Sequence, residues 1–309
     1  MNTNAGQFFI GIDSGGSKCR IVIAATDMKV ILKKTYTGIH YSVTGAEKYS
    51  SLVSLYIRDS LKIKNLKLKD CKGICLGIAG AREKSDRRKL KKSFCAILNF
   101  KNVLITTDAM TALYGAFEGE DGIIIISGTG SVLYGLSENK IKRVGGWGRI
   151  IGDEGSGYWI GKRALNLITK EFDGSFSQSL LSEHISNEFG ITAGNVNERI
   201  FHGKFNIQDI APAVIECAEK NCPLSLKIIS EAAGDLVSHV KTFLRTTNRK
   251  NPVNIVFTGS VIENKNLLSV MLKRKLEKIK IVSVTEKKHS PEFGALLLAK
   301  YKPDILSKL

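Results

Sequence analysis

Long apolar stretches are missing from this 309-residue sequence, and no run approaches the ~18 apolar residues that a membrane-spanning helix needs. The first seven residues are polar and lack the basic, apolar and small-residue succession of a secretion signal, so we expect a cytoplasmic protein without a membrane segment. Five prolines are too few for a fibrous or linker-rich chain. Six cysteines are too few for a disulfide scaffold, and we expect reduced thiols that pack as small apolar side chains.

Negative charge is also scarce, because 29 Asp and Glu against 46 Lys and Arg leave a formal net charge of +17. Such an excess raises the question of nucleic-acid binding. The basic residues are scattered, however, in runs such as 87–92 and 273–275, which lie on expected helices and are typical of solvated faces. We therefore expect no nucleic-acid partner. The charge indicates general lysine usage or attraction for a polyanionic small substrate.

Strands and helices alternate along the chain, which predicts an α/β architecture. The length suggests two domains at ~150 residues each. The expected strands are 8–13, 19–25, 30–36, 73–79, 103–105, 123–126, 132–136, 253–257 and 279–284. The expected helices are 46–61, 85–98, 108–114, 155–170, 177–189, 207–220, 224–244, 267–276 and 291–302.

A glycine-rich turn between two strands occurs twice, about one domain length apart, as Ser14-Gly15-Gly16-Ser17 and Ser127-Gly128-Thr129-Gly130-Ser131. Successive backbone N–H groups in such turns can hold an anion. Two interpretations are possible: two ordinary β-hairpins, or two loops that hold one nucleoside triphosphate. The repeat favours the second. Asp13, at the end of the first strand, suits Mg²⁺ bound through water, and Ser17 and Lys18 can reach phosphate oxygens.

Three further segments carry candidate functional residues. Asp108 follows a strand and begins a helix, where it is either an N-cap or a ligand contact at the strand end. The glycine-rich segment 145–157 presents Trp147 and Asp153, an apolar face and a carboxylate that suit a sugar. The segment 258–261 is either a simple turn or, with Gly294 of the last helix, leaves room for an adenine ring.

Taken in order, these segments resemble the actin/hexokinase/heat-shock-ATPase superfamily, in the branch of N-acetylglucosamine kinases that is grouped with BadF/BadG/BcrA/BcrD ATPases. The resemblance covers about residues 8–300, and the glycine-rich segment 145–157 is its most specific part. It implies two ribonuclease-H-like (actin-like ATPase) domains with a cleft between them. The implied domains are residues 1–112 with 291–309, and residues 113–290. They would close on ATP, Mg²⁺ and a small sugar.

The resemblance also implies a role for each matching residue. Asp108 would be the catalytic base and a sugar contact, and Asp13 would lie near the metal. The implied nucleotide contacts are Gly15, Gly16, Ser17, Lys18, Thr129, Gly130, Gly259, Ser260 and Gly294. The implied sugar contacts besides Asp108 are Gly146, Trp147 and Asp153.

Three polar sugar contacts of that branch are replaced in this sequence, by Ile39, Ala79 and Val132, which leaves the identity of the sugar open. We expect an ATP-dependent kinase of an amino sugar (N-acetylglucosamine, glucosamine or an N-acetylmuramic-acid-like sugar) or of a related hexose. The alternative is a BadF-type ATPase that acts as an activator or conformational switch for a partner enzyme. A homodimer is an assembly that the resemblance allows.

Overall fold

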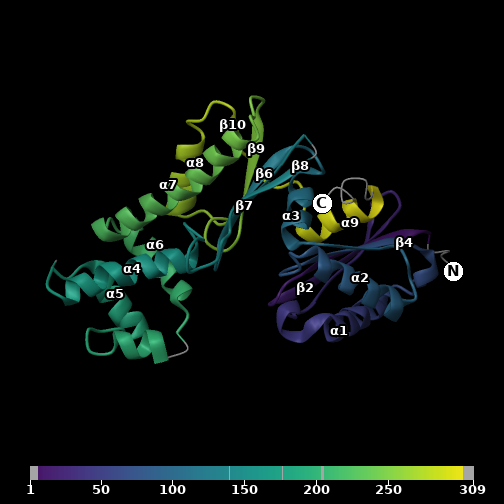
Figure 1. Ribbon diagram of the computed structural model, residues 1–309, viewed down its shortest axis with the longest axis horizontal. Coiled ribbons are helices and arrows are strands. Elements are labelled where there is room, and N and C mark those ends of the chain that lie inside the picture. The colour runs from purple at the N-terminus through teal and green to yellow at the C-terminus, as the bar shows by residue number, and fades with distance from the viewer. Residues whose placement is uncertain (1–5, 139, 176, 203–204, 302–309) are drawn as a thin grey trace. The chain divides into compact units, whose positions relative to one another are not determined.

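The computed structural model describes residues 6–138, 140–175, 177–202 and 205–301, which divide into two compact units (Figure 1). Unit 1 runs to Glu120 and takes up the chain again from Lys287, and unit 2 comprises Asp121–Glu286. The expected boundary between residues 112 and 113 falls inside helix α3, which lies wholly in unit 1. Residues 1–5 and 302–309, which the sequence assigned to the first domain, lie outside the described residues.

Unit 1 is built on a five-stranded sheet in the order β3-β2-β1-β4-β5. Its strands are β1 (Phe8–Ser14), β2 (Lys18–Ala25), β3 (Val30–Thr37), β4 (Cys71–Ile78) and β5 (Val103–Thr106). β1 pairs antiparallel with β2 and parallel with β4. The apolar runs of β1, β2, β4 and β5 are largely buried, as expected for strands covered on both faces. The edge strand β3 has no buried residue.

Helices cover both faces of this sheet. α1 (Tyr41–Ile63) packs against α2 (Lys84–Leu98), and the short 3-10 turn η1 (Leu68–Asp70) precedes β4. α3 (Asp108–Phe117) and α9 (Pro291–Tyr301) pack together on the other face, α9 lying against β1 and β4 (Figure 1). The last helix therefore returns to the first unit; its expected end at residue 302 lies outside the described residues.

The close packing of α9 depends on glycines. A Cβ on Gly11 of β1 would lie 2.2 Å from the carbonyl oxygen of Glu292, and one on Gly294 would lie 2.0 Å from that of Thr111 in α3. A Cβ on Gly115 of α3 would lie 2.5 Å from the carbonyl oxygen of Ser290. Hydrogens in place of side chains thus let a strand and two helices touch through their backbones.

Unit 2 repeats the sheet of unit 1. Its strand order is β10-β9-β6-β7-β8, and its central strand β6 pairs antiparallel with β7 and parallel with β9, as β1 does with β2 and β4. The strands are β6 (Gly122–Ser127), β7 (Ser131–Ser137), β8 (Lys140–Gly145), β9 (Val253–Thr258) and β10 (Val282–Val284). The duplication indicated by the two glycine turns is therefore present in the topology.

The helices of unit 2 are α4 (Gly157–Phe172), α5 (Leu180–Phe189), α6 (Ala211–Glu219), α7 (Pro223–Thr246) and α8 (Leu267–Leu276). α7 packs on β7 and β8, where the ring of Phe243 occupies the space above Gly135. The helix expected at 207–220 is divided into the 3-10 turn η3 (Ile207–Ile210) and α6. Pro212 in the first turn of α6 has no N–H with which to continue a preceding helix. A π-turn, η2 (Glu198–His202), follows α5.

Two strands of unit 2 differ from the sequence expectation. β8 was not expected, because its lysines and arginine conceal the strand pattern, yet they suit an edge strand that must not pair with another chain. The strand expected at 279–284 is confined to β10, Val282–Val284.

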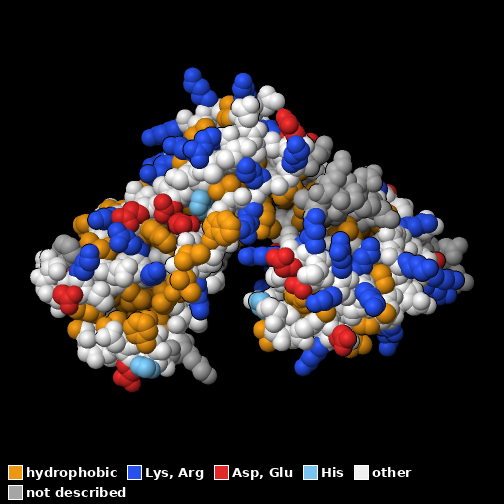
Figure 2. Space-filling model, viewed as in Figure 1, with side chains coloured by type: hydrophobic (Ala, Val, Ile, Leu, Met, Phe, Trp, Pro, Cys, Tyr) orange, Lys and Arg blue, Asp and Glu red, His pale blue; other side chains and the backbone are white. Residues whose placement is uncertain are grey.

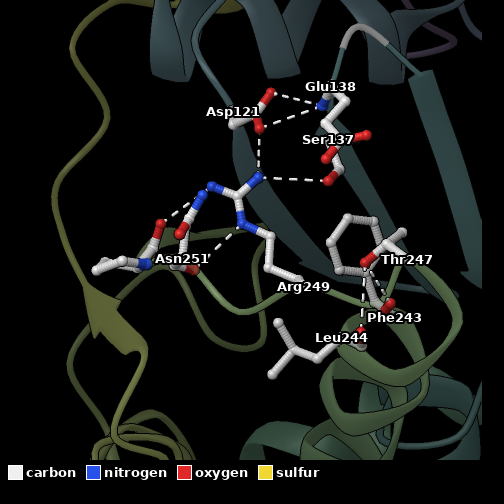
Figure 3. A network of polar contacts seen from close by, with 9 residues as sticks. Asp121, Ser137, Glu138, Phe243, Leu244, Thr247, Arg249 and Asn251 are labelled. Atoms are coloured by element: carbon white, nitrogen blue, oxygen red, sulfur yellow. Dashed lines mark hydrogen bonds and ion pairs between the residues drawn. The ribbon is translucent and has the colours of Figure 1, made fainter.

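The guanidinium group of Arg249 links three segments of unit 2 through polar contacts (Figure 3). Arg249 forms an ion pair with Asp121, which precedes β6, and donates to Ser137 Oγ at 3.3 Å and to the carbonyl oxygen of Pro252 at 3.0 Å. Asp121 also accepts the N–H of Glu138 at 3.1 Å. The side chain of Arg249 is 11% exposed, so this network links the β7–β8 turn to the segment that precedes β9 in a partly water-free setting.

The distribution of basic side chains and the state of the cysteines agree with what the sequence predicted. Lys and Arg side chains are spread over the visible face of both units (Figure 2). All six cysteines are free, and five of them are buried. None of the described helices combines the length and the apolar character needed to cross a membrane.

The packing role of Gly294 gives a first prediction. Gly294→Ala should lower the free energy of unfolding of unit 1 by about 3 kcal/mol, because a methyl group must force α3 and α9 apart. Thermal and chemical unfolding measure this. Gly234→Ala is the matched control, since a Cβ on this glycine of α7 meets nothing within 4 Å and should be neutral or stabilising. Equal stability of the two variants would contradict the packing role.

Candidate active site

In unit 1 the candidate residues come together where the parallel strands end. Asp13 of β1 lies opposite Gly77 of β4, and Gly77 lies opposite Thr106 of β5, two residues before Asp108. The carboxyl ends of these strands therefore share one edge of the sheet. Open α/β sheets bind their ligands at this edge.

The first glycine turn is held by backbone hydrogen bonds and is exposed at residues 16–18. Gly15 donates its N–H to the carbonyl oxygen of Lys18 at 3.0 Å, which closes the turn. The backbone N–H groups of Gly38 and Ile39 donate to Ser17 and Gly15 at 3.2 and 3.1 Å. Residues 16–18 themselves are exposed, as a phosphate-binding turn requires.

Ile39 has a different function from the polar residue that it replaces. Its backbone holds the first glycine turn, and its side chain packs against the hydrophobic core of unit 1. The neighbouring His40 lies over the turn, because a Cβ on Gly16 would lie 2.9 Å from its ring. Ile39 therefore contributes packing and backbone contacts at this place.

Asp108 begins α3 and is held by its neighbours. The hydroxyl of Thr107 caps the helix by accepting the N–H of Met110 at 3.2 Å, and Asp108 Oδ1 accepts the N–H of Ala109 at 3.0 Å. The capping alternative thus applies to Thr107. Asp108 remains exposed, but the surrounding protein partly removes its carboxyl group from water and raises its pKa, while Ala109 N–H and the charge of Arg82 oppose the rise.

Asp13 carries the strongest electrostatic perturbation of the described acids. Burial raises its pKa to about 7, and the charges of Asp108 and Glu292 add to the effect. The guanidinium of Arg20, 3.4 Å from Asp13 Oδ2, acts in the opposite direction. The site is therefore short of positive charge. Glu292 was missed in the sequence, where the only signal was an acid in the first turn of an otherwise apolar helix.

The second glycine turn lies in unit 2 and is held by residues 154–157. Gly128 donates to the carbonyl oxygen of Gly130 at 3.0 Å, which closes the turn. The hydroxyls of Ser127 and Ser131 donate to the carbonyl oxygens of Gly155 and Glu154 at 2.8 and 2.6 Å. Thr129 at the tip is exposed. The two sequence motifs of unit 2 thus form one local structure.

Asp153 lies against the second glycine turn. Its Oδ1 accepts the N–H of Gly148 at 3.1 Å, and a Cβ on Gly130 would lie 2.6 Å from its Oδ2. Asp153 is buried, with a left-handed φ of 58°. Trp147 of the same segment is 67% exposed, and the guanidinium of Arg143 lies 4.6 Å from its ring centroid. In the fold Asp153 lies directly behind Gly130. The roles of Asp153 and Trp147 as sugar contacts stay predictions.

The backbone of the segment 145–157 also explains Val132. A Cβ on Gly146, which has a φ of +71°, would lie 2.7 Å from Val132 Cγ2. Val132 therefore supports Gly146 from below. A methyl group here fills space against backbone, where the resemblance implied a polar sugar contact.

A pocket of about 480 Å³ adjoins the second glycine turn. Thr129 and Ser260 border it, together with residues of η3, α6 and the segment 264–266. Gly259 shapes this wall, because its φ of +100° lets its Cα approach the backbone of Ser127. The polar lining residues Gln208, Asn264 and Lys265 were missed, since nothing local in the sequence distinguishes them from surface residues.

Gly294 is buried in unit 1 between α3 and α9, where its lack of a side chain serves helix packing. Its expected contact with adenosine stays a prediction.

Solved structures define the class of fold. A protein of known structure from Chromobacterium violaceum is 24% identical and superimposes with a TM-score of 0.74, over 95% of this chain and 99% of the other. A glucokinase from Streptomyces griseus, solved with glucose and AMPPNP, is 14% identical with a TM-score of 0.57, over 95% and 98%. The duplicated sheet is therefore the actin-like ATPase fold found in sugar kinases, as expected.

The sequence comparisons identify the family. The profile of the BadF/BadG/BcrA/BcrD ATPase family matches residues 10–299. An N-acetylmuramic acid/N-acetylglucosamine kinase of Clostridium acetobutylicum is 32% identical, over 96% of this chain and 100% of that protein. An N-acetyl-D-glucosamine kinase of Dictyostelium discoideum is 26% identical, over 95% and 98%. The chain belongs to the BadF/BadG/BcrA/BcrD ATPase family.

The raised pKa of Asp13 predicts a pH-dependent stability. Between pH 3.8 and about 7 the unfolded chain releases the Asp13 proton while the folded protein keeps it, so the free energy of unfolding falls as pH rises. Asp13→Asn does not titrate. In chelator-treated protein the variant should melt above the wild type near pH ~8, and the difference should vanish near pH ~4.

Melting curves across this pH range test the prediction, with Asp27→Asn as the control on an exposed turn of the same unit. A difference between wild type and Asp13→Asn that does not change with pH would contradict it.

Proposed function

We propose that this chain is an ATP-dependent kinase that transfers a phosphoryl group to a hydroxyl of an amino sugar. The observation that carries the proposal is the duplicated glycine turn, each copy at the end of an equivalent strand, with the Asp108 carboxylate at the sheet edge of the first copy. Phosphoryl transfer needs positioning and neutralisation of charge, and two N–H-rich turns with one acceptor-side carboxylate provide both.

The nucleotide is assigned first. The pocket beside Thr129 and Ser260 has the size and the polar lining of a nucleoside site, and it adjoins a turn suited to phosphate oxygens. Residues 15–18 of unit 1 form the equivalent turn, which we also assign to phosphate oxygens.

Mg²⁺ is assigned to the surroundings of Asp13. No three His, Cys, Asp or Glu side chains of the described residues are grouped so as to bind a metal ion directly. A hydrated ion that meets carboxylates through its waters fits Asp13 and its acidic neighbours better. Bound there, the ion would neutralise charge on the transferring phosphate.

Asp108 is assigned as the base for the acceptor hydroxyl. Its carboxyl group is exposed at the strand edge, and a raised pKa brings it closer to that of an effective general base. The N–H of Ala109 and the nearby charge of Arg82 oppose this rise in the pKa of Asp108.

The acceptor is an amino sugar, as the names of the relatives indicate. The polar side chains that the site lacks indicate which amino sugar it is. Ile39 and Val132 are engaged in packing, so they offer no hydrogen bond to an acetamido group. Trp147 presents an exposed aromatic face that suits the apolar face of a sugar ring. We infer a substrate with a larger or less polar substituent than that of N-acetylglucosamine.

The alternative, an activator or switch ATPase, gains no support from the comparisons. The curated relatives named above are sugar kinases, and their similarity extends over nearly the whole chain. A cytoplasmic location and a homodimer stay predictions.

An acceptor screen with Asp108→Asn tests the kinase. Purified protein with ATP and Mg²⁺ should consume ATP only when an amino sugar such as N-acetylmuramic acid, glucosamine or N-acetylglucosamine is added. Asp108→Asn should lower kcat at least ~100-fold and leave ADP affinity nearly unchanged, because the carboxylate acts on the acceptor. Asp70→Asn is the control in the same unit. Full activity of Asp108→Asn, or no response to any sugar, would overturn the proposal.

The nucleotide pocket has its own test. Ser260→Trp should weaken ADP binding at least tenfold, roughly 1.4 kcal/mol, since an indole fills space beside Thr129. Ser283→Trp, on the exposed side of β10, should bind ADP as the wild type does. Isothermal titration calorimetry measures both affinities, and unchanged binding by Ser260→Trp would place the nucleotide elsewhere.

A further inference from the structure

Glu292 is a buried acid without an evident partner. It is 9% exposed, and its Oε2 atom is buried and accepts no hydrogen bond from the described residues. It belongs to the first turn of α9, whose remaining buried residues are apolar or glycine. A carboxylate removed from water without a donor or a cation is costly, so this position calls for an explanation.

The backbone places Glu292 beside Asp13. The carbonyl oxygen of Glu292 lies against Gly11, and side chains two residues apart on a strand share one face of the sheet. Asp13 is therefore on the face of β1 that α9 covers, one strand repeat beyond this contact. The charge of Glu292 acts on Asp13 across this short space, as does the charge of Asp108.

The carboxylates around Asp13 outnumber the positively charged groups near them. Asp13, Asp108 and Glu292 bring three carboxylates to this edge of the sheet, and Arg20 is the ion-pair partner of Asp13 among the described residues. The Arg20 contact is 3.4 Å long, and its side chain is 42% exposed, so it compensates only in part. A divalent cation would supply what is lacking.

We propose that Glu292 forms the buried wall of the divalent-cation site at Asp13, where Oε2 accepts a hydrogen bond from a water molecule of the hydrated ion. The inference rests on the proposed function, because it takes Asp13 as the residue nearest to the ion that accompanies ATP. It adds a residue from the far end of the chain to that site, and it gives the orphaned oxygen a partner.

A purely structural role is the competing explanation. An acid in the first turn of a helix stabilises it through the helix dipole. That role predicts lower stability when the charge is removed and no change in cation affinity. The proposal predicts that removing the charge weakens cation binding and leaves the stability of the metal-free protein unchanged or higher.

The experiment compares wild type, Glu292→Gln, Glu292→Asp and the control Glu47→Gln, which removes an exposed acid from the same unit. Electron paramagnetic resonance measures Mn²⁺ binding to each protein saturated with ADP. Calorimetry measures ADP affinity without metal, and melting is followed in chelator.

For Glu292→Gln we expect about tenfold weaker Mn²⁺ binding, equal or tighter metal-free ADP binding and an unchanged or higher melting temperature. The loss of a negative charge explains the last two. Mn²⁺ affinity equal to that of wild type, or a lower melting temperature with unchanged Mn²⁺ affinity, overturns the inference. Should Glu292→Gln not fold, Glu292→Asp decides in the same way, since its retracted carboxylate should also weaken Mn²⁺ binding.

The controls separate this inference from the proposed function. Wild type that binds neither ADP nor Mn²⁺ with ADP would contradict the kinase proposal itself. Wild type that binds both, together with a Glu292→Gln variant of equal Mn²⁺ affinity, would contradict only the role of Glu292.

Discussion

Contact between backbones at glycine is the constraint on which unit 1 depends. Gly11, Gly115 and Gly294 allow β1, α3 and α9 to meet at distances that any side chain would prevent. Because of this contact, the chain from Lys287 onward completes the unit that the first 120 residues begin. The same contact brings the first turn of α9, and Glu292 with it, to the strand that ends in Asp13. Packing and site chemistry therefore have one origin.

The electrostatics of the site follow from this architecture. Asp13 is the penultimate residue of β1, Asp108 begins α3 and Glu292 lies in the first turn of α9. The topology itself therefore gathers three acids at one edge of the sheet. Burial and like charge raise the pKa of Asp13 to about 7. A protein of net charge +17 thus holds its acids where a cation and a polyphosphate would meet. The surrounding excess of Lys and Arg favours the approach of such an anion.

The sequence predicts features that depend on neighbouring residues along the chain. The two glycine turns and their strands are evident because apolar runs and Gly-Ser turns are local signals. The position of Asp108 at a strand end is equally local. The family resemblance supplied the fold class, which the duplicated sheet confirms.

Features that depend on long-range packing were not predictable in this way. The packing of Gly294 against α3 could not be predicted, because α3 is far away in sequence. Ile39 packs into a core whose other residues are distant along the chain. The sequence around Glu292 gives almost no indication of its burial, since this depends on the strand against which the helix packs. For the same reason the contact of Asp153 with Gly130 could not be predicted.

The segment 145–157 shows how these long-range contacts prepare a binding surface. A Cβ on Gly145 would lie 2.8 Å from the ring of His239, and one on Gly155 would lie 2.7 Å from Leu236, so α7 fixes both ends of the segment. Asp153 fixes it again through Gly148. The large apolar side chains exposed at its tip are Trp147, Ile150 and Ile151, with the exposed Arg149 between them. An apolar surface whose backbone is already held loses little conformational entropy when a ligand covers it. At the sugar site that we propose for this segment, a backbone held in this way would favour recognition of a sugar by an apolar face.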